Sequence, residues 1–254
     1  MVSGGFSRRT GNKNQGGRSG EDLDGTKPGS HGSNQTGMGA GVPLRDRPDL
    51  SAHTRRAQVQ APNTDSSDQE VFESALDRNE LNFDSQNFAS IHLEQAEIEG
   101  LSFVESELRD FIIRDASLRN SNFSNASCRG LKVDDVDLEN SNFNNADLNG
   151  SIFKNTGLKK STMRDCDLYG SSFQDVDLAL VDFSDSDLGL STFTDVELAG
   201  ASFQGADLSG ASFEEVHFED TDFTNASLED INVQNCEGTI IISGERMSLE
   251  DLLG

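Results

Sequence analysis

The sequence predicts an all-β coil in which the chain makes one side every five residues and closes one turn every four sides. From Phe83 to Val233 every fifth residue is apolar, which gives 31 central positions without an insertion. A period of five fits neither an α-helix nor a β-strand, whose side chains recur every ~3.6 and every two residues. The chain must therefore turn once every five residues, with the same part of each unit facing inward.

A longer period of twenty residues indicates how many sides close a turn. In steps of twenty from Phe83, seven of the eight residues are Phe, and Met163 is the exception. In the same steps after Phe88, every residue is Leu except Cys128. Four sides of five residues explain this, because stacked turns place like residues above like. Two residues before the central position, 24 of 31 side chains are Ala, Ser, Thr, Val or Cys, so one large and one small residue face inward.

Four segments are expected in order along the chain: a tail over 1–66, a capping helix over 67–80, the repeats over 81–235 and a C-terminal cap over 236–254. The tail holds all four Pro and 12 of the 24 Gly and has few apolar side chains, so we expect it to be disordered. Residues 1–60 carry a net charge of +4. Alternatives to a solvated tail are a tether, a clamp onto the acidic body of the chain, or an arm that binds a partner.

Both ends of the coil are expected to be covered. Ser67 and Glu70 fit a capping box, and apolar residues follow at helical spacing from Val71 to Leu76. At the other end, residues 240–242 are three Ile and predict a last strand, and residues 248–254 predict a short helix. Three leucines of that helix either cover the last turn or pack between two chains of a homodimer: Leu249, Leu252 and Leu253.

Composition excludes several classes of protein. The chain has 254 residues and a formal net charge of −25, so its rod should not bind nucleic acid or an anionic lipid surface directly. No stretch of about 18 apolar residues exists, so no membrane span is expected. Three Cys without CxxC spacing indicate neither a disulfide framework nor a zinc site, and no signal peptide is recognised. We expect a cytoplasmic protein without metal or cofactor.

No catalytic, cofactor-binding or metal site is predicted. The sequence has no P-loop, GxGxxG, HExxH or Ser/His/Asp pattern. His92 and His217 fall on different sides of the coil, where we expect each to be exposed singly. Cys128 and Cys166 fall on inward positions and are expected to be small core residues. Continuous coils leave no long loop on which to build a pocket, so we expect a protein that is not an enzyme.

Stacking at twenty residues also places acidic side chains in two outward columns. Like charges about 5 Å apart repel each other, so stability alone does not favour such columns. A local explanation stays open, because a short polar side chain just before the central residue can hydrogen-bond the backbone. The first column is Asp147, Asp167, Asp187 and Asp207. The second is Asp115, Asp135, Asp175, Asp195 and Glu215, interrupted by Asn155.

The charge is also unevenly distributed along the coil. Residues 165–235 hold 17 Asp and Glu and no Lys or Arg. With turns about 4.8 Å apart, this segment carries about one negative charge per Å. Double-stranded DNA carries about one per 1.7 Å, so a protein groove that takes DNA could take this rod.

The repeats resemble those of the pentapeptide repeat family, whose consensus is A(D/N)LXX. Residues 146–150 (ADLNG) and 206–210 (ADLSG) match it directly. The resemblance implies a right-handed quadrilateral β-helix of about 7.75 coils. The best-understood members are acidic DNA mimics that bind type II topoisomerases such as gyrase, and some protect gyrase from quinolones. This chain lacks the loop interruptions found in several of those members, and it carries a basic tail that they lack.

Three functions remain open from the sequence. The first is a non-enzymatic rod that binds a protein partner through its acidic surface, as an interaction scaffold or regulator. The second is a DNA mimic that binds gyrase and modulates it or protects it from inhibitors. The third is an acid-rich surface selected for solubility at high salt, with the function elsewhere in the chain.

Overall fold

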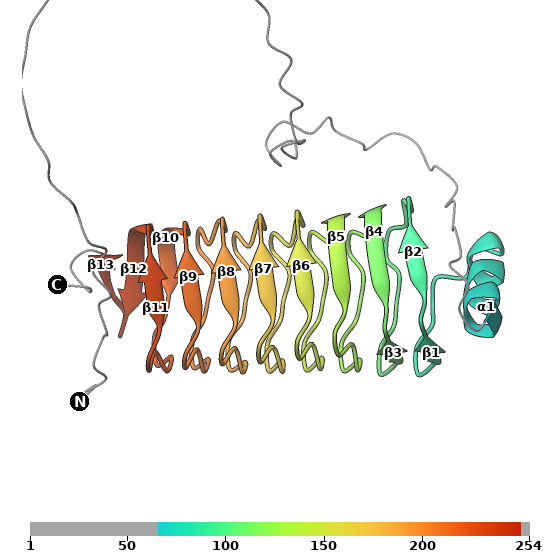
Figure 1. The fold of residues 1–254 in the computed structure, drawn as a ribbon, viewed down its shortest axis with the longest axis horizontal. Helices are drawn as coiled ribbons and strands as arrows, with labels where there is room; N and C mark the ends of the chain where they lie inside the picture. Colours follow the sequence, from blue (N-terminus) through green and yellow to red (C-terminus); the bar gives the residue numbers. More distant parts are fainter. Residues whose placement is uncertain (1–65, 250–254) are drawn as a thin grey trace, which may run out of the picture.

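The chain forms a straight β-solenoid closed by a helix at one end (Figure 1). The structure is a computed structural model that describes residues 66–249. Helix α1 (Ser66–Asp77) lies against the first turn, and β12 (Glu237–Ile242) and β13 (Glu245–Ser248) lie at the opposite end. Most of the predicted tail, together with Leu252 and Leu253, falls outside the described residues.

Parallel strands stack along the rod in a register of twenty residues. Pairs such as Phe153 with Phe173 and Phe173 with Phe193 repeat this register along a continuous sheet of eight strands, in the order β11-β9-β8-β7-β6-β5-β4-β2. The bounds of these strands are β2 His92–Glu94, β4 Ile112–Ser117, β5 Lys132–Asp137, β6 Ile152–Lys154, β7 Ser172–Gln174, β8 Thr192–Thr194, β9 Ser212–Glu214 and β11 Asn232–Gln234. The predicted closure of each turn after four sides is confirmed.

The other sides of the rod keep the same register with fewer paired residues. Strands β1 (Asn87–Ala89) and β3 (Glu107–Arg109) form a two-stranded sheet, and β10 (His217–Asp222) pairs with β12. Elsewhere single parallel bridges join residues twenty apart. All sides of the rod therefore share one hydrogen-bond register.

The core is a stack of the central side chains. The rings of Phe123 and Phe143 lie 4.8 Å apart and 2° from parallel, and those of Phe183 and Phe203 lie 4.9 Å apart and 9° from parallel. Burial of each large apolar side chain contributes about 1.5–3 kcal/mol before chain entropy is counted. A core one side chain wide explains why a hydrophobic content of 33% is sufficient.

Several of the compact inward residues donate hydrogen bonds to backbone carbonyls inside the rod. The hydroxyl of Ser161 donates to the carbonyl of Leu138 at 2.9 Å, and that of Ser186 donates to the carbonyl of Met163 at 2.6 Å. Cys166 takes the same place, with Sγ 2.9 Å from the carbonyl oxygen of Phe143. A buried carbonyl without a partner is unfavourable, so a Ser or Cys at this position stabilises the turn through its donor, whereas Ala and Val occupy the same position by packing alone.

Every corner of the rod has a left-handed backbone. All 31 residues two places after a central residue have φ between 48° and 75°. Gly, Asn and Asp tolerate this conformation best, which accounts for the seven glycines of this position that recur from Gly100 to Gly210. Leu180 and Leu190 adopt it as well, although their side chains do not favour it.

Helix α1 covers the first turn of the rod. Its side chains pack and hydrogen-bond where the backbone of a preceding turn would otherwise lie. Phe72 is fully buried, with its ring centroid 4.7 Å from that of Phe83. The amide of Gln69 accepts from the N–H of His92 at 2.9 Å and donates to its carbonyl at 3.0 Å. A carboxylate oxygen of Asp68 accepts from the N–H of Ala89 at 2.9 Å. The exposed strand edge is therefore satisfied as well as covered.

The bounds of this helix differ from the prediction at both ends. It begins at Ser66, so Ser67 lies inside the first turn instead of at the capping position. It ends at Asp77 because Asn79 takes φ 61° and donates to the carbonyl of Leu76 at 2.8 Å, while Glu80 donates to that of Ala75 at 3.0 Å. These two bonds form a Schellman motif.

The C-terminal cap is a strand hairpin. The strand predicted from Ile240 to Ile242 is present in β12. Ser248 belongs to β13, and a helix begins one residue later than predicted, at Leu249; the rest of the predicted helix lies outside the described residues. Strand β13 runs antiparallel to β12. Ser243 and Gly244 connect the two with φ of 54° and 78°, a two-residue turn with both φ positive. Leu249 follows directly and is buried.

Gly238 ends the repeat. It occupies what would be the next central position, and a Cβ there would lie 1.5 Å from the carbonyl oxygen of Phe218. Its φ of 116° also favours glycine. The register then shifts by one residue, since Thr221 pairs with Ile240, and Ile240 becomes the buried residue of the last turn.

We predict that Phe72→Ala destabilises the rod by about 3–5 kcal/mol, because it opens a cavity at the end of the phenylalanine stack. Chemical unfolding followed by circular dichroism measures the loss. Val71→Ala is the matched control, since Val71 lies on the same helix and is 59% exposed. Equal losses in the two variants would show that the ring of Phe72 does not close the rod.

Candidate acidic interaction surface

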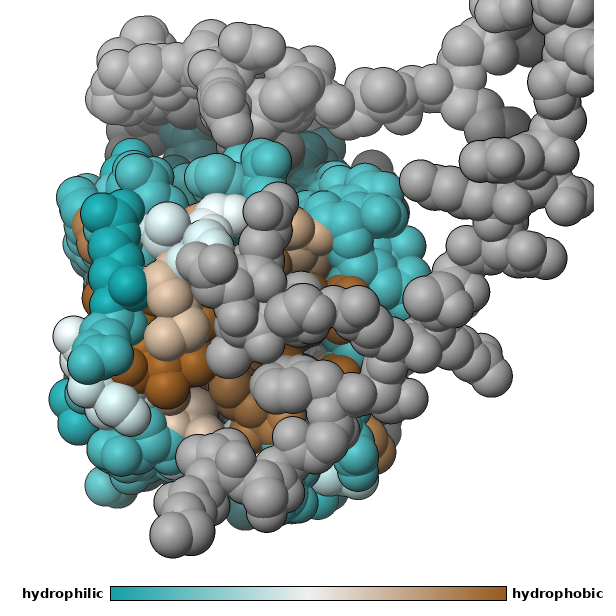
Figure 2. All heavy atoms as spheres, turned by 90° about the vertical axis from the view of Figure 1, so that its left-hand side faces the viewer, coloured by the Kyte–Doolittle hydropathy of each residue, from teal (hydrophilic) through white to brown (hydrophobic). Residues whose placement is uncertain are grey.

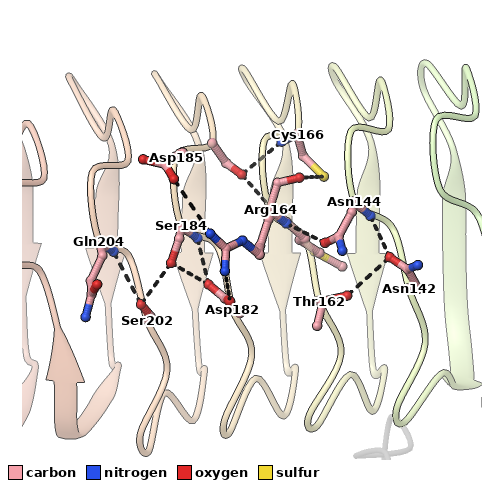
Figure 3. Close-up of polar contacts among 12 residues, drawn as sticks. Asn142, Asn144, Thr162, Arg164, Cys166, Asp182, Ser184, Asp185, Ser202 and Gln204 are labelled. Carbon is pink, nitrogen blue, oxygen red and sulfur yellow. Dashed lines mark hydrogen bonds and ion pairs between the residues drawn. The ribbon is translucent and has the colours of Figure 1, made fainter.

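Residues 165–235, called here the acidic half, form the C-terminal part of the rod. Three arginines from outside this segment reach its edges: Arg129, Arg164 and Arg246. Arg164 lies 3.5 Å from Asp182 and 3.9 Å from Asp185 in the following turn (Figure 3). At the far end Arg246 of β13 lies 2.5 Å from Asp220. The acidic half is therefore partly neutralised at its ends. The sequence does not indicate the contact of Arg246, because no strand is expected at residues 245–248.

The first acidic column is built as predicted and has a local structural role. Parallel bridges join Asp147, Asp167, Asp187 and Asp207 in order along the rod. Each carboxylate accepts a hydrogen bond from the N–H two residues later in its own side. These distances run from 2.9 Å at Asp207 to 3.3 Å at Asp147. A short polar acceptor is thus required at this position, as the local explanation proposed.

This column divides into a paired part and an open part. Arg129 lies 2.5 Å from Asp147 and 4.0 Å from Asp167. Asp187 and Asp207 are exposed, and neither forms an ion pair with a residue of the described segment 66–249. Hydrogen bonds from the hydroxyl and the N–H of Ser209 lower the pKa of Asp207, which keeps its charge. The open negative charge of the first column therefore lies at its C-terminal end.

The second column lies on the left-handed corners. Asp115, Asp135, Asp175, Asp195 and Glu215 all have positive φ, and Asn155 interrupts the column with the same backbone. Conformation thus favours the short members of this set, Asp and Asn, over most other residue types. Stacking has an electrostatic cost, since burial and the charge of Asp135 raise the pKa of Asp115. The carboxyl of Asp195 raises the pKa of Glu215, first by hydrogen bonding and then by its charge.

The remaining candidates of the sequence analysis form no site. His217 lies 3.5 Å from Glu237, and burial raises the pKa of the Cys128 and Cys166 thiols to about 12, which suits core residues. Within residues 66–249 no three His, Cys, Asp or Glu side chains are arranged to hold a metal ion. No helix of that segment is long and apolar enough to cross a membrane.

Three exposed apolar side chains in the acidic half are not predicted from the sequence. They are Tyr169, Leu180 and Leu190, with exposed fractions of 44%, 52% and 53%. The sequence did contain a signal. Tyr169 is the only Tyr of the chain and occupies an outward position, and the two Leu stand where Asp, Asn or Gly usually form the corner.

We predict that Glu215→Gln raises the melting temperature at pH about 7.5 and has little effect near pH 4.5. The folded-state pKa of Glu215 is raised, so the protonated carboxyl stabilises the folded chain. This stabilisation is fully present below the unfolded pKa and is lost as pH rises through the folded pKa. Glutamine removes the repulsion that remains at neutral pH. Thermal melting at both pH values tests this, with Glu229→Gln as a control of equal charge change. A pH-independent effect of Glu215→Gln would contradict the pairing with Asp195.

Comparison with known proteins places this geometry in a family. The profile for the pentapeptide repeat region matches residues 136–213 and 168–239, and that for pentapeptide repeats in eight copies matches residues 102–140. No curated protein matches the sequence.

Solved structures with the same repeat are similar only at a distance. Trypsin-treated QnrB1, a plasmid-mediated fluoroquinolone resistance protein, shares 16% identity over 62% of this chain and 91% of its own, with a TM-score of 0.33. HetL, involved in heterocyst differentiation regulation in the cyanobacterium Nostoc, shares 20% identity over 65% of this chain and 92% of its own, with a TM-score of 0.22. A protein of the Arabidopsis thaliana thylakoid lumen shares 24% over 43% and 69%, with a TM-score of 0.25. With its repeats matched and stacked in a twenty-residue register, the chain belongs to the pentapeptide repeat family.

Proposed function

We propose that the chain is a non-enzymatic rod that binds a protein partner through its acidic half, as an interaction scaffold or regulator. The observation that carries this proposal is the excess of carboxylates over what the fold requires. Asp187 and Asp207 are exposed and lack an ion pair within the described residues. An open column of fixed charge attracts a cationic surface and steers its approach.

The local roles of these carboxylates do not explain their charge. Asn142 makes the same turn as the first column, since its side-chain oxygen accepts from the N–H of Asn144 at 2.9 Å. Asn155 takes the same corner conformation as the second column. Asparagine would therefore serve the backbone equally well at Asp175, Asp187 and Asp195, without like-charge repulsion.

DNA mimicry is the second candidate, and the linear charge density favours it. The acidic half carries about one negative charge per Å of rod, comparable with double-stranded DNA. A type II topoisomerase such as gyrase has a groove shaped and charged for a duplex. On this proposal the rod competes with DNA for that groove, and it modulates the enzyme or protects it from inhibitors.

We predict that the full chain inhibits DNA supercoiling by gyrase at low salt and that the inhibition weakens as salt increases, since charge pairing is screened. The triple variant Asp175→Asn, Asp187→Asn, Asp195→Asn should lose most of the inhibition. Asp110→Asn, Asp115→Asn, Asp135→Asn is the matched control, with the same charge change in the first half of the rod. No inhibition at roughly hundredfold molar excess in low salt would rule out mimicry toward gyrase.

The wider proposal has its own measurement. Affinity capture from a native lysate compares the full chain with the two triple variants and with a chain lacking residues 1–65. Loss of one specific partner with the acidic-half variant alone supports binding through that surface. Equal capture by both triple variants contradicts it, and loss on removal of 1–65 assigns recruitment to the tail.

The apolar C-terminal end provides a further contact, which we propose joins two chains in a homodimer. Apolar residues lie at the centre of this end within a hydrophilic rim (Figure 2). Ile231, Val233, Ile242 and Met247 are only partly buried there. Light scattering at tens of micromolar should give twice the chain mass, and Leu252→Asp with Leu253→Asp should halve it. A monomeric mass for the unaltered chain would exclude the homodimer.

A further inference from the structure

Tyr169 and Leu190 form an exposed apolar step beside the first acidic column. The next turn has glycine where each side chain lies: a Cβ at Gly189 would be 3.0 Å from Cδ2 of Tyr169, and one at Gly210 would be 2.6 Å from Cδ2 of Leu190. Gly189 lacks the positive φ of the corners, so its backbone alone does not require glycine. The space over the two glycines is filled by the two apolar side chains.

Folding gives no reason for leucine at this corner. Leu190 has φ 57° and keeps half of its side chain in solvent, so it combines backbone strain with little burial. Asp, Asn or Gly form most other corners, and Asn or Gly would suit the same backbone better. Strain of this kind and exposed apolar side chains both concentrate at binding surfaces.

The exposed apolar side chains lie next to carboxylates that have no ion pair within the described residues. The point where a Cβ of residue 189 would lie is 3.2 Å from Oδ1 of Asp187, as well as 3.0 Å from the ring of Tyr169. Asp207 follows one turn later on the same side. A surface that combines an aromatic ring, an aliphatic side chain and two open carboxylates is complementary to a segment with both cationic and apolar side chains.

We propose that Tyr169, Asp187, Leu190 and Asp207, called here the Leu190 corner, bind a basic amphipathic helix of a protein partner that lies along the rod. Its Lys or Arg side chains would pair with the aspartates, and one aliphatic side chain would pack between Tyr169 and Leu190. This assignment rests on the proposed function, because it names the chemistry of the partner that the acidic half takes.

Spacing favours a helix over an extended segment. The aspartates of the column repeat about every 4.8 Å along the rod, and a helix presents side chains on one face about every 5.4 Å. Over the one interval between Asp187 and Asp207 the mismatch is about 0.6 Å, which Lys and Arg side chains absorb. An extended segment presents every second side chain about 6.7 Å apart, so its mismatch over the same interval is about 1.9 Å.

Leu180 provides the internal comparison. It has φ 61°, is 52% exposed and lies over Gly200, whose Cβ would be 2.7 Å from its Cδ2. Two residues later, however, Asp182 is paired with Arg164. The Leu180 corner therefore shares the apolar feature of the Leu190 corner but lies beside a neutralised carboxylate.

Fluorescence anisotropy with a defined probe tests the proposal. The probe is a labelled helical peptide of about 18 residues with one stripe of Lys interrupted by a single Leu, and a scrambled peptide of the same composition is the control. The full chain at low salt should bind the striped peptide at least about tenfold more tightly. Leu190→Asn or Tyr169→Ser should weaken binding about tenfold, and Leu180→Asn should change it less than about twofold.

Thermal melting separates binding from folding in these variants. Asn suits a left-handed corner, so Leu180→Asn and Leu190→Asn should melt at or above the temperature of the unaltered chain. Equal weakening by both Leu variants overturns the assignment. So does weakening confined to Asp187→Asn and Asp207→Asn, which would reduce the contact to charge alone. Failure of the probe to bind also overturns it, whereas partner capture through the acidic half is measured separately and would still stand.

Discussion

The twenty-residue register of parallel hydrogen bonds is the constraint on which the rest of this structure depends. It places ring on ring inside the rod, as in Phe153, Phe173 and Phe193, and it fixes which outward side chains become neighbours. A register that holds in every turn requires an identical corner every five residues. The left-handed corners and the glycine at position 238, where the register changes, both follow from this requirement.

The repeating part of the fold was predictable because each turn repeats the same demands on the chain. Central residues, compact inward residues and glycine corners each left a periodic signal. The ends were less predictable, because they occur once. The side-chain amide of Gln69 bonds the backbone of His92, where a strand would bond it elsewhere in the rod. This contact occurs once, so no periodic pattern in the sequence predicts it. Ser243 and Gly244 are typical of a hairpin turn. Two residues alone do not predict a hairpin, however, and the strand β13 that follows them has no periodic pattern of its own.

The candidate surface was predictable in outline and not in detail. The sequence places the aspartates in columns, since position alone decides which ones stack. It does not tell which of them meet an arginine, because Arg129 and Arg164 reach into a later turn and Arg246 comes from a strand that lies outside the repeat. The apolar step at Tyr169 depends on the absence of a side chain at Gly189 in the next turn, which is a relation between two positions.

The closed end formed by α1 gives the rod a direction in assembly. Gln69 and Asp68 use the hydrogen-bonding groups that would otherwise accept another strand, so the stack cannot lengthen from that side. In the proposed homodimer, the two copies would therefore meet at the hairpin end. A dimer joined there has helix α1 at each outer end, so neither outer end presents a free strand edge. Such a dimer is a closed assembly and does not extend into a fibre.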